Sequence, residues 1–331
     1  MSVYAPVSVV LPHWNRRELL LRLLKHLEGQ SAPPEEVIVV DAGSEDGSAD
    51  AAERRGVRVV RMGGNPGFAA LVNAGIRAAH CPWVAIVNND VTPQPDWLER
   101  LLEAAEKEGA WFACGLLLEE SRPNQVDGAF DLISRAACVW RAGNGKADGP
   151  LWRQPRRVHL PPLTATLLRK QLFDEVGLLD EHFESYLEDV DFGLRCALRG
   201  LCGIYVPNAA AYHVGSATLG RWHPETVRRI SRNQVFLLAK HWPPGWAGRY
   251  GWAVLVGQAL WGVLALRHGA AWAWLAGKWE GIRRYRSMRR PWPAPQTARL
   301  VGLLEESESE LLRLQRQTGF DWYWKLYFSL T

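Results

Sequence analysis

The sequence has few cysteines for its 331 residues, and no two of them form a CxxC pair. The five are Cys81, Cys114, Cys138, Cys196 and Cys202. An odd number of scattered cysteines argues against a disulfide framework and against a zinc site, and it fits a reducing compartment. We therefore expect a protein of the cytoplasm.

Long apolar runs are also missing. The apolar stretch at residues 252–266 is 15 residues long and is broken only by glycines and Gln258. A helix that crosses a bilayer needs about 20 apolar residues, so this stretch is too short. A strand-like pattern begins within ten residues of Met1 and leaves no room for a signal peptide. We expect neither a leader nor a membrane span.

Two glycine-rich phosphate-binding motifs are absent as well. No GxGxxG follows the first expected strand, where the turn is Pro12-His13-Trp14-Asn15, and no GxxxxGKS/T occurs. A dinucleotide-dependent reductase or a P-loop enzyme needs these motifs to hold phosphate groups. The sequence therefore argues against both classes.

The charge is unevenly distributed along the chain. Residues 1–215 carry 22 Lys and Arg against 28 Asp and Glu, a net charge of −6. Residues 216–331 carry 17 against 7, a net charge of +10, and they contain 11 of the 17 tryptophans. A basic, tryptophan-rich segment favours an anionic membrane surface or nucleic acid as its partner.

The arrangement of the tryptophans favours the membrane. Several of them precede a basic cluster, which consists of Arg283, Arg284, Arg286, Arg289 and Arg290. Aromatic residues beside basic clusters are typical of segments that lie in a membrane interface. Nucleic-acid-binding surfaces interleave aromatic residues with Lys and Arg, so we expect no nucleic-acid partner. The alternative is a helical hairpin packed on the protein, with its arginines in solvent.

Strand-like and helix-like segments alternate in the N-terminal part. Apolar runs predict strands at 7–11, 36–41, 57–61 and 83–88, and apolar spacing predicts helices at 16–28, 48–55 and 67–80. This alternation is typical of right-handed βαβ units and a parallel sheet. Residues 111–160 are poorly periodic and predict a long excursion from the sheet, and a further strand is expected at 163–169.

Polar residues follow two of the expected strands. Asn88, Asn89 and Asp90 come directly after a buried strand, while Asp41 ends another strand and Asp46 lies in the turn after it. The carboxyl ends of parallel strands form the ligand crevice of such sheets, and these oxygen atoms suit a hard divalent cation, a ribose or a base. The alternative is structural, because Asp and Asn also favour turns and helix caps.

Three carboxylates crowd into four residues at Glu188, Asp189 and Asp191, just before a helical pattern. Acidic residues are favourable at a helix N-terminus, so a decorated cap is one interpretation. Crowded like charges also raise one another's pKa, which suits a general base that works near neutral pH. Arg195 could hold the group by ion pairing.

Several of these stretches resemble one family. Residues 39–48 (VVDAGSEDGS) resemble the VDNGSTDGS signature of family-two glycosyltransferases, which have the GT-A fold. Residues 65–75 (NPGFAALVNAG) are similar to the NxGFxxxxNxG stretch of the rhamnosyltransferase-like branch. Residues 88–90 occupy the place of the DxD motif, and the acidic cluster resembles FEDVDLxLR. The resemblance covers residues 7–242 and implies a GT-A-type α/β fold, a mostly parallel sheet flanked by helices, with a helical C-terminal extension.

The resemblance also implies roles for individual residues. Asp189 would be the catalytic base, with Glu188 and Asp191 orienting it or the acceptor. Asp90 and His213 would bind Mg²⁺ or Mn²⁺, although a lone histidine is more often structural. Asn88 replaces the first acid of DxD, so that Asp90 supplies the only charge there. The donor would be bound by Pro12, Asp41, Asp46, Gly67, Asn73, Asn88, Asn89 and Asp90.

These inferences predict a domain at 1–242 and a helical region at 243–331 for membrane or homodimer contact. Residues 1–110 would bind the nucleotide and residues 111–242 the acceptor. The expected activity is an inverting, metal-dependent transfer of a sugar, with rhamnose as a candidate, from a nucleotide-diphosphate sugar. The acceptor would be a cell-envelope glycan or lipid-linked molecule at the inner face of the plasma membrane. The alternative is a non-catalytic sugar-nucleotide-binding partner in a membrane-bound assembly complex.

Overall fold

The computed structural model describes residues 4–215, 220, 222–290 and 292–331. The chain divides into two compact units. The first comprises residues 1–130 and 143–215, and the second comprises residues 131–142 and 216–331. These units are defined by packing, and the predicted functional boundary at residue 242 stays a prediction.

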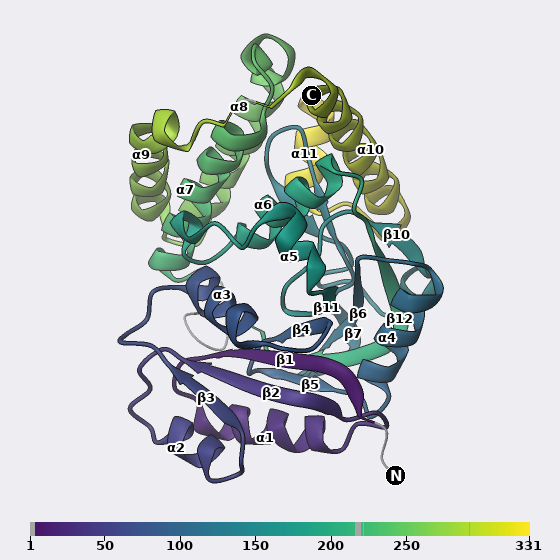
Figure 1. Cartoon of the computed structure of the whole chain (residues 1–331). Helices are drawn as coiled ribbons and strands as arrows, with labels where there is room; N and C mark the ends of the chain where they lie inside the picture. The colour runs from purple at the N-terminus through teal and green to yellow at the C-terminus, as the bar shows by residue number, and fades with distance from the viewer. Residues whose placement is uncertain (1–3, 216–219, 221, 291) are drawn as a thin grey trace. The chain divides into compact units, whose positions relative to one another are not determined.

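The first unit is built on a mixed sheet of ten strands (Figure 1). The order is β10 (Arg156–Val158), β12 (Gly203–His213), β6 (Phe112–Glu119), β11 (Ala165–Arg169), β4 (Trp83–Val87), β1 (Ala5–His13), β2 (Pro34–Asp41) and β3 (Arg58–Arg61), with β5 (Val91–Pro93) paired to β12 and β7 (Arg122–Gly128) to β6. The β1–β4 group is parallel, as are β6 and β12, while β11 runs antiparallel between β4 and β6. The predicted α/β class with a mostly parallel sheet is confirmed.

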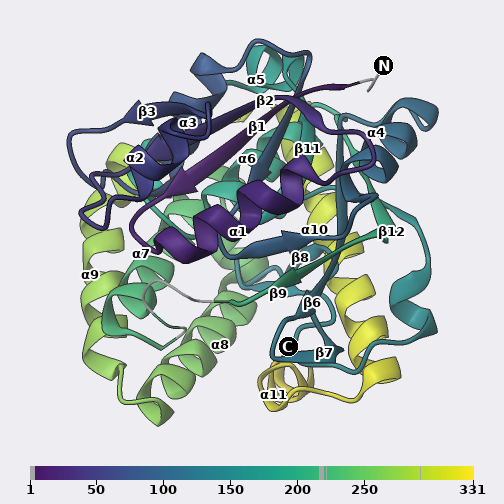
Figure 2. The same ribbon diagram turned by 90° about the horizontal axis from the view of Figure 1, so that it is seen from below.

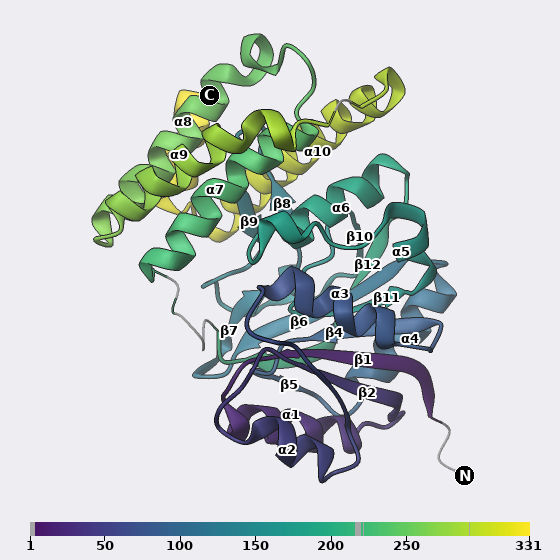
Figure 3. The ribbon, with the colours of Figure 1, turned by 60° about the vertical axis from the view of Figure 1, so that its left-hand side comes forward.

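Helices cover both faces of this sheet. They are α1 (Arg17–Glu28), α2 (Ser48–Glu53), α3 (Phe68–Ala78), α4 (Trp97–Lys107), α5 (Gln171–Val176) and α6 (Glu188–Leu198), with short 3₁₀ turns at Pro150–Arg153 and Glu181–Phe183. Figures 1 and 3 show α1 and α2 on one side of β1 and β2, with α3 on the other. Seen from below, α1 lies across the sheet (Figure 2).

The sequence pattern explains how these layers pack. Alternate residues of β1 contribute to one core cluster, which also contains the buried leucines of α1 at positions 20, 23, 24 and 27. That spacing places the leucines on one helical face. On α3, a Cβ at Gly75 would lie only 2.2 Å from a methyl carbon of Val10. The absence of a side chain at Gly75 therefore lets α3 approach β1 closely.

The predicted excursion at 111–160 is wrong for its first part, because β6 lies within the sheet. Residues 112–118 are all buried. A strand covered on both faces is apolar throughout and shows no alternation, so the pattern that betrays a half-exposed strand is missing. The strand predicted at 163–169 corresponds to β11.

The second unit is mainly helical. It contains α7 (Pro224–His241), α8 (Trp246–Arg267), α9 (Ala271–Met288), α10 (Ala294–Thr318) and α11 (Trp322–Leu330), together with a hairpin of β8 (Asp131–Ile133) and β9 (Val139–Arg141). The helical C-terminal region is thus confirmed. Among the described residues, no helix combines the length and the apolar character needed to cross a membrane.

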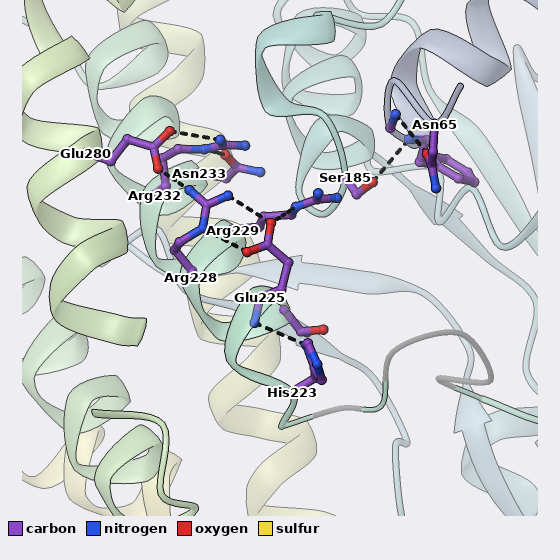
Figure 4. A network of polar contacts seen from close by, with 12 residues as sticks. Asn65, Ser185, His223, Glu225, Arg228, Arg229, Arg232, Asn233 and Glu280 are labelled. Carbon is purple, nitrogen blue, oxygen red and sulfur yellow. Dashed lines mark hydrogen bonds and ion pairs between the residues drawn. The ribbon is translucent and has the colours of Figure 1, made fainter. Parts of the chain in front are cut away.

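Glycines and ion pairs hold α9 against α7. A Cβ at Gly277 would lie 2.2 Å from the Arg228 carbonyl oxygen, so the two backbones meet where α9 has no side chain. Arg228 binds Glu225 on its own helix and Glu280 on α9, and Arg232 reaches Glu280 at 3.0 Å (Figure 4). Arg232 is 1% exposed, and Glu280 balances its charge.

A β-bulge in β12 depends on Gly115 of β6. The register of the two strands shifts between Val206 and Ala211. A Cβ at Gly115 would lie 1.7 Å from the Ala209 carbonyl oxygen. The bulge therefore fits over a residue that has no side chain, and it leads into the end of β12 at His213.

Replacing this glycine should destabilise the first unit. We expect Gly115→Ala to lower the free energy of unfolding by about 1–3 kcal/mol, because the added methyl group must displace a buried backbone carbonyl. Denaturant unfolding would measure the change. Gly63→Ala is the matched control, since a Cβ there meets nothing within 4 Å. Equal stability of the two variants would contradict this account of the bulge.

Candidate active site

Polar side chains gather where the parallel strands of the first unit end. His13 ends β1, Asp41 ends β2, residues 88–90 follow β4, and His213 ends β12. These strands run in the same direction, so their carboxyl ends lie at one edge of the sheet, where ligands bind in open α/β folds. The topology thus assembles side chains that lie far apart in the sequence.

Asp90 and His213 are held together by the pairing of β5 with β12. In this antiparallel pair His213 lies opposite Val91, and the Val214 N–H donates to the Asp90 carbonyl at 3.1 Å. The Asp90 Oδ1 lies 3.2 Å from His213 Nε2, and the Asp127 Oδ2 lies 2.8 Å from His213 Nδ1. One imidazole therefore lies between two carboxylates.

The surroundings of His213 favour its charged form. Burial by itself would lower the pKa of the imidazole, but hydrogen bonds to Asp127 and Asp90 raise the pKa to about 9. A cation held by Asp90 Oδ1 and His213 Nε2 would take the place of this proton. Carboxylate oxygen and imidazole nitrogen are suitable ligands for Mn²⁺, and Asp127 would fix the ring from its other nitrogen. The residues therefore fit a divalent metal.

Asp127 was not predicted from the sequence. It lies on β7, within the segment at 111–160 where no periodic pattern was found. Its contact with His213 joins residues 86 positions apart. No local signal in the sequence marks such a partner.

Asp41, the last residue of β2, and Asp46, in the turn after it, differ in whether a side-chain oxygen remains without a hydrogen-bond partner. Asp46 Oδ2 accepts from the Arg17 N–H at 2.8 Å and its Oδ1 from the Ser48 N–H at 3.1 Å, so both oxygens hold the starts of helices. Asp41 Oδ2 accepts from the N–H groups of Gly43 and Ser44. Asp41 Oδ1 is buried without a partner. The structural alternative thus describes the contacts of Asp46, while Asp41 keeps one oxygen for a ligand.

His13 is a further site residue that the sequence analysis did not select. It is 1% exposed, and its Nδ1 lies 2.9 Å from the amide nitrogen of Asn89. Burial lowers the pKa of its imidazole, against the opposing charges of Asp41 and Asp46. Nε2 is buried and has no partner. With Asn89 donating to Nδ1, the ring proton lies on Nε2 and is available to an acceptor. The signal that could have revealed His13 is a histidine at the end of an apolar strand, next to the buried Pro12 that was selected.

Gly67 and Asn73 were predicted to bind the donor, and the structure shows them holding another segment. Gly67 has a φ of 99°, and the backbone of Glu184 lies 2.9 Å from the place of a Cβ. The Phe68 N–H donates at 3.1 Å to the Oγ of Ser185, which is labelled in Figure 4. The Asn73 amide binds both the carbonyl and the N–H of Leu179. Both residues therefore attach α3 to the segment that leads to α6.

This segment enters α6 through an unusual backbone. Glu184, Tyr186 and Leu187 all have positive φ, with values of 59°, 72° and 65°. Residues other than glycine rarely adopt this conformation, so three of them within four residues indicate a backbone that its surroundings constrain. Glu188 and Asp189 follow directly as the first residues of α6.

The three carboxylates of α6 have different environments. Asp191 is fully buried and pairs with Arg195 at 3.1 Å, as the sequence suggested. Arg195 also donates to the carbonyl groups of Val176 and Leu178, so this pair is part of the packing. Glu188 is buried as well, whereas Asp189 is half-buried and its Oδ1 accepts from the Val190 N–H. Asp189 is therefore the most accessible acid of the three.

Comparisons with known proteins agree with this fold and give the family of the chain. The family match and the relatives identify a nucleotide-sugar-dependent glycosyltransferase, so the predicted enzyme class is confirmed. The model of the family described as Glycosyl transferase family 2 matches residues 8–177, and the chain belongs to this family. The predicted rhamnosyltransferase-like branch is also confirmed by the relatives.

The chain is 30% identical over 277 residues to an N-acetylglucosaminyl-diphospho-decaprenol L-rhamnosyltransferase of Mycobacterium tuberculosis, covering 75% of this chain and 87% of that protein. It is 26% identical over 222 residues to the O-antigen biosynthesis protein RfbC of Myxococcus xanthus, covering 64% of this chain and 17% of that protein. The relative from M. xanthus is named for O-antigen biosynthesis, in agreement with the predicted cell-envelope setting.

Two solved structures share the GT-A fold. GalNAc-T7 with UDP, GalNAc and Mn²⁺ has a TM-score of 0.60 at 13% identity, and the match covers 85% of this chain and 57% of that one. The mannosyltransferase PcManGT from Pyrobaculum calidifontis, in complex with GDP-Man and Mn²⁺, has a TM-score of 0.52 at 16% identity, with 99% and 87% covered. These likenesses confirm the predicted fold.

Metal affinity at this site should depend on pH. Because the metal-free His213 has a pKa of about 9, a cation at Nε2 must displace a proton at lower pH. We expect Mn²⁺ affinity to rise by roughly tenfold per pH unit between about pH 6 and pH 8, as measured by calorimetry in buffers of different ionisation enthalpy. In Asp127→Asn one carboxylate is lost, so the rise should shift to lower pH. An Mn²⁺ affinity that does not change with pH would contradict binding at His213. The variant Asp90→Ala should lose Mn²⁺ binding at this site.

Proposed function

We propose that the chain transfers a rhamnosyl group from a nucleoside-diphosphate donor to a lipid-linked glycan acceptor, with inversion at the anomeric carbon and with a divalent cation. The observation that carries this proposal is the Asp90–His213–Asp127 constellation at the strand ends, which shares the first unit with the accessible Asp189. The relative from M. tuberculosis is named as an L-rhamnosyltransferase that acts on a decaprenol-linked acceptor, which supports the choice of sugar and acceptor class.

The donor would be bound at the carboxyl ends of β1, β2 and β4. Asp90 and His213 would hold Mn²⁺ or Mg²⁺, and both solved neighbours are complexes with Mn²⁺. The bound cation supplies neutralisation of the negative charge that develops on the diphosphate leaving group. The buried Asp41 Oδ1 accepts a hydrogen bond from the nucleoside, and His13 Nε2 donates one to the donor.

Asp189 acts as the general base. Its carboxylate takes the proton of the acceptor hydroxyl while the acceptor oxygen forms a bond to the anomeric carbon. The bond from that carbon to the diphosphate breaks in the same displacement, and the diphosphate leaves on the opposite face. A single displacement of this kind inverts the configuration. The buried Glu188 and the Asp191–Arg195 pair keep the start of α6 in place.

Removing the base without changing its shape should separate catalysis from binding. We expect Asp189→Asn to slow transfer by roughly 10²-fold or more, the usual scale for loss of a general base, with unchanged donor affinity and melting temperature. Asp191→Asn is the contrasting variant, because it breaks a buried ion pair and should lower the melting temperature. Wild-type turnover in Asp189→Asn would show that another group is the base.

The second unit carries an apolar surface that supports the proposed place of action, the cytoplasmic face of the plasma membrane. Large apolar side chains stand exposed at intervals of three to eight residues, on one side of α8 and on one side of α9: Trp252, Leu255, Val263, Leu266, Trp272, Leu275, Trp279 and Ile282. Trp272 is 84% exposed. Exposed apolar patches of this kind mark interaction sites, and helices with such a side lie in membrane interfaces.

Basic side chains next to this patch favour anionic lipid as its partner. Arg283, Arg286 and Arg290 are exposed on or just after the last turns of α9. Each contributes roughly 1 kcal/mol near an anionic leaflet. Two other arginines of the predicted cluster have packing roles, because Arg289 donates to the Ala239 and Trp242 carbonyl groups and Arg284 lies over the Phe236 ring.

Vesicle binding tests this surface. Changing Arg283, Arg286 and Arg290 to Gln, or Trp272 and Trp279 to Ser, should release the protein from anionic vesicles in a flotation assay and leave transfer to a short soluble acceptor unchanged. Wild-type binding should weaken with salt, because exposed charges are screened over about 8–10 Å.

The control is a triple variant in which the exposed Arg54, Lys107 and Arg199 of the first unit are changed to Gln. This variant should bind vesicles as the wild type does. If the wild type ignores anionic vesicles, the proposal fails. A dimer that dissociates in the tryptophan variant would instead assign the patch to a second copy of the chain.

A further inference from the structure

A second group of metal-binding side chains lies at the opposite end of the sheet from the active site. Glu35 is near the start of β2, and His80 and Cys81 lie in the turn before β4, separated from it by Pro82. One ligand atom from each of these three residues lies within 4.8 Å of the others. The three side chains are therefore close enough to bind one metal ion together.

The imidazole of His80 is oriented as a metal ligand would be. Its Nε2 lies 3.5 Å from the Glu35 Oε1, on the side of the cluster, and its Nδ1 lies 3.0 Å from the Glu36 Oε2. Histidines that bind metals usually donate their other ring N–H to a carboxylate, which fixes the tautomer and the ring orientation. Glu36 is in the position of that carboxylate.

Glu36 is itself firmly held. Its side chain is only 11% exposed, and it accepts from Ser8 Oγ at 2.8 Å and from Arg58 Nη1 at 3.1 Å. These two hydrogen bonds fix the Glu36 carboxylate beside the His80 ring. Ser8 Oγ also accepts from the Cys81 N–H at 3.1 Å. One buried serine of β1 thus helps to place both His80 and Cys81.

We propose that Glu35, His80 and Cys81 form a site for a borderline-soft transition metal of the Zn²⁺ class, separate from the metal of the active site. A thiolate, an imidazole and a carboxylate are three ligands that tetrahedral Zn²⁺ accepts, with water in the fourth position. Mg²⁺ and Mn²⁺ favour oxygen ligands and avoid thiolate. The ligand chemistry therefore separates the two sites, and Cys81 releases its proton to solvent when the metal binds.

A metal here would join the start of β2 to the turn between α3 and β4. These two segments belong to the strands whose other ends carry Asp41 and Asn88–Asp90. An ion that binds only the folded chain stabilises it in proportion to its saturation. The proposal does not rest on the transfer reaction, so its failure leaves the proposed function untouched. The sequence argument against a zinc site rested on the absence of paired cysteines. It therefore does not apply to a site that contains a single cysteine.

Co²⁺ is the probe for this site, because a cobalt–thiolate bond gives a charge-transfer absorption band. Full-length protein saturated with Mg²⁺ should bind one equivalent of Co²⁺ with this band, and Zn²⁺ should displace it and raise the melting temperature. Cys81→Ser should abolish the band. The matched control is Cys202→Ser, since Cys202 is a partly exposed thiol whose Sγ lies 3.3 Å from His159 Nδ1. That variant should keep the band.

Three further variants keep the test decisive if Cys81→Ser folds poorly. His80→Gln changes an exposed side chain and should weaken Co²⁺ binding at least tenfold, and Glu36→Gln should weaken it by 10- to 100-fold, the usual range for an outer-shell partner. Asp90→Ala, which disables the active-site metal, should leave the band intact. A band that persists in Cys81→Ser, that vanishes in Cys202→Ser, or that never forms would overturn the proposal.

Discussion

The proposed active site depends on a short antiparallel pairing between β5 and the end of β12. Three residues on each strand are enough to fix His213 opposite Val91 and thereby to place the Asp90 carboxylate at the imidazole. The pairing works because β12 bends at a bulge that Gly115 accommodates. The first unit thus uses backbone hydrogen bonds, which are insensitive to side-chain identity, to position two side chains that must not move.

The electrostatic balance at His213 follows from this placement. Two carboxylates beside one buried imidazole leave an excess of negative charge that only a bound cation or a proton can compensate. The geometry proposed to bind a metal therefore favours a proton on His213 when no metal is bound. Burying polar groups in this way costs stability unless every group has a partner, and Asp127 provides that partner from β7.

The sequence predicted the strand ends well and the contacts between distant segments poorly. Asp41, Asp90 and His213 could be placed together because polar residues after apolar strands of a parallel sheet must converge. Asp127 and β6 could not be placed, because an apolar run buried on both faces has no period and the partner of His213 lies 86 positions away. Asn73 was predicted to bind the donor, and the motif gave no sign of the hydrogen bonds that its amide makes with Leu179. A sequence motif indicates which residues matter, but the hydrogen-bond partner of a side chain such as the Asn73 amide is known only from the structure.

The contact between Gly67 and Glu184 limits which substitutions the two segments can accept during evolution. The backbone of Glu184 occupies the space that any side chain at position 67 would need, and Glu184 itself begins the run of positive φ before α6. Neither segment can therefore be altered independently of the other. A homologue that replaces this glycine must also reshape the turn at 184–187, so these positions should covary in an alignment even though they are separated by more than a hundred residues.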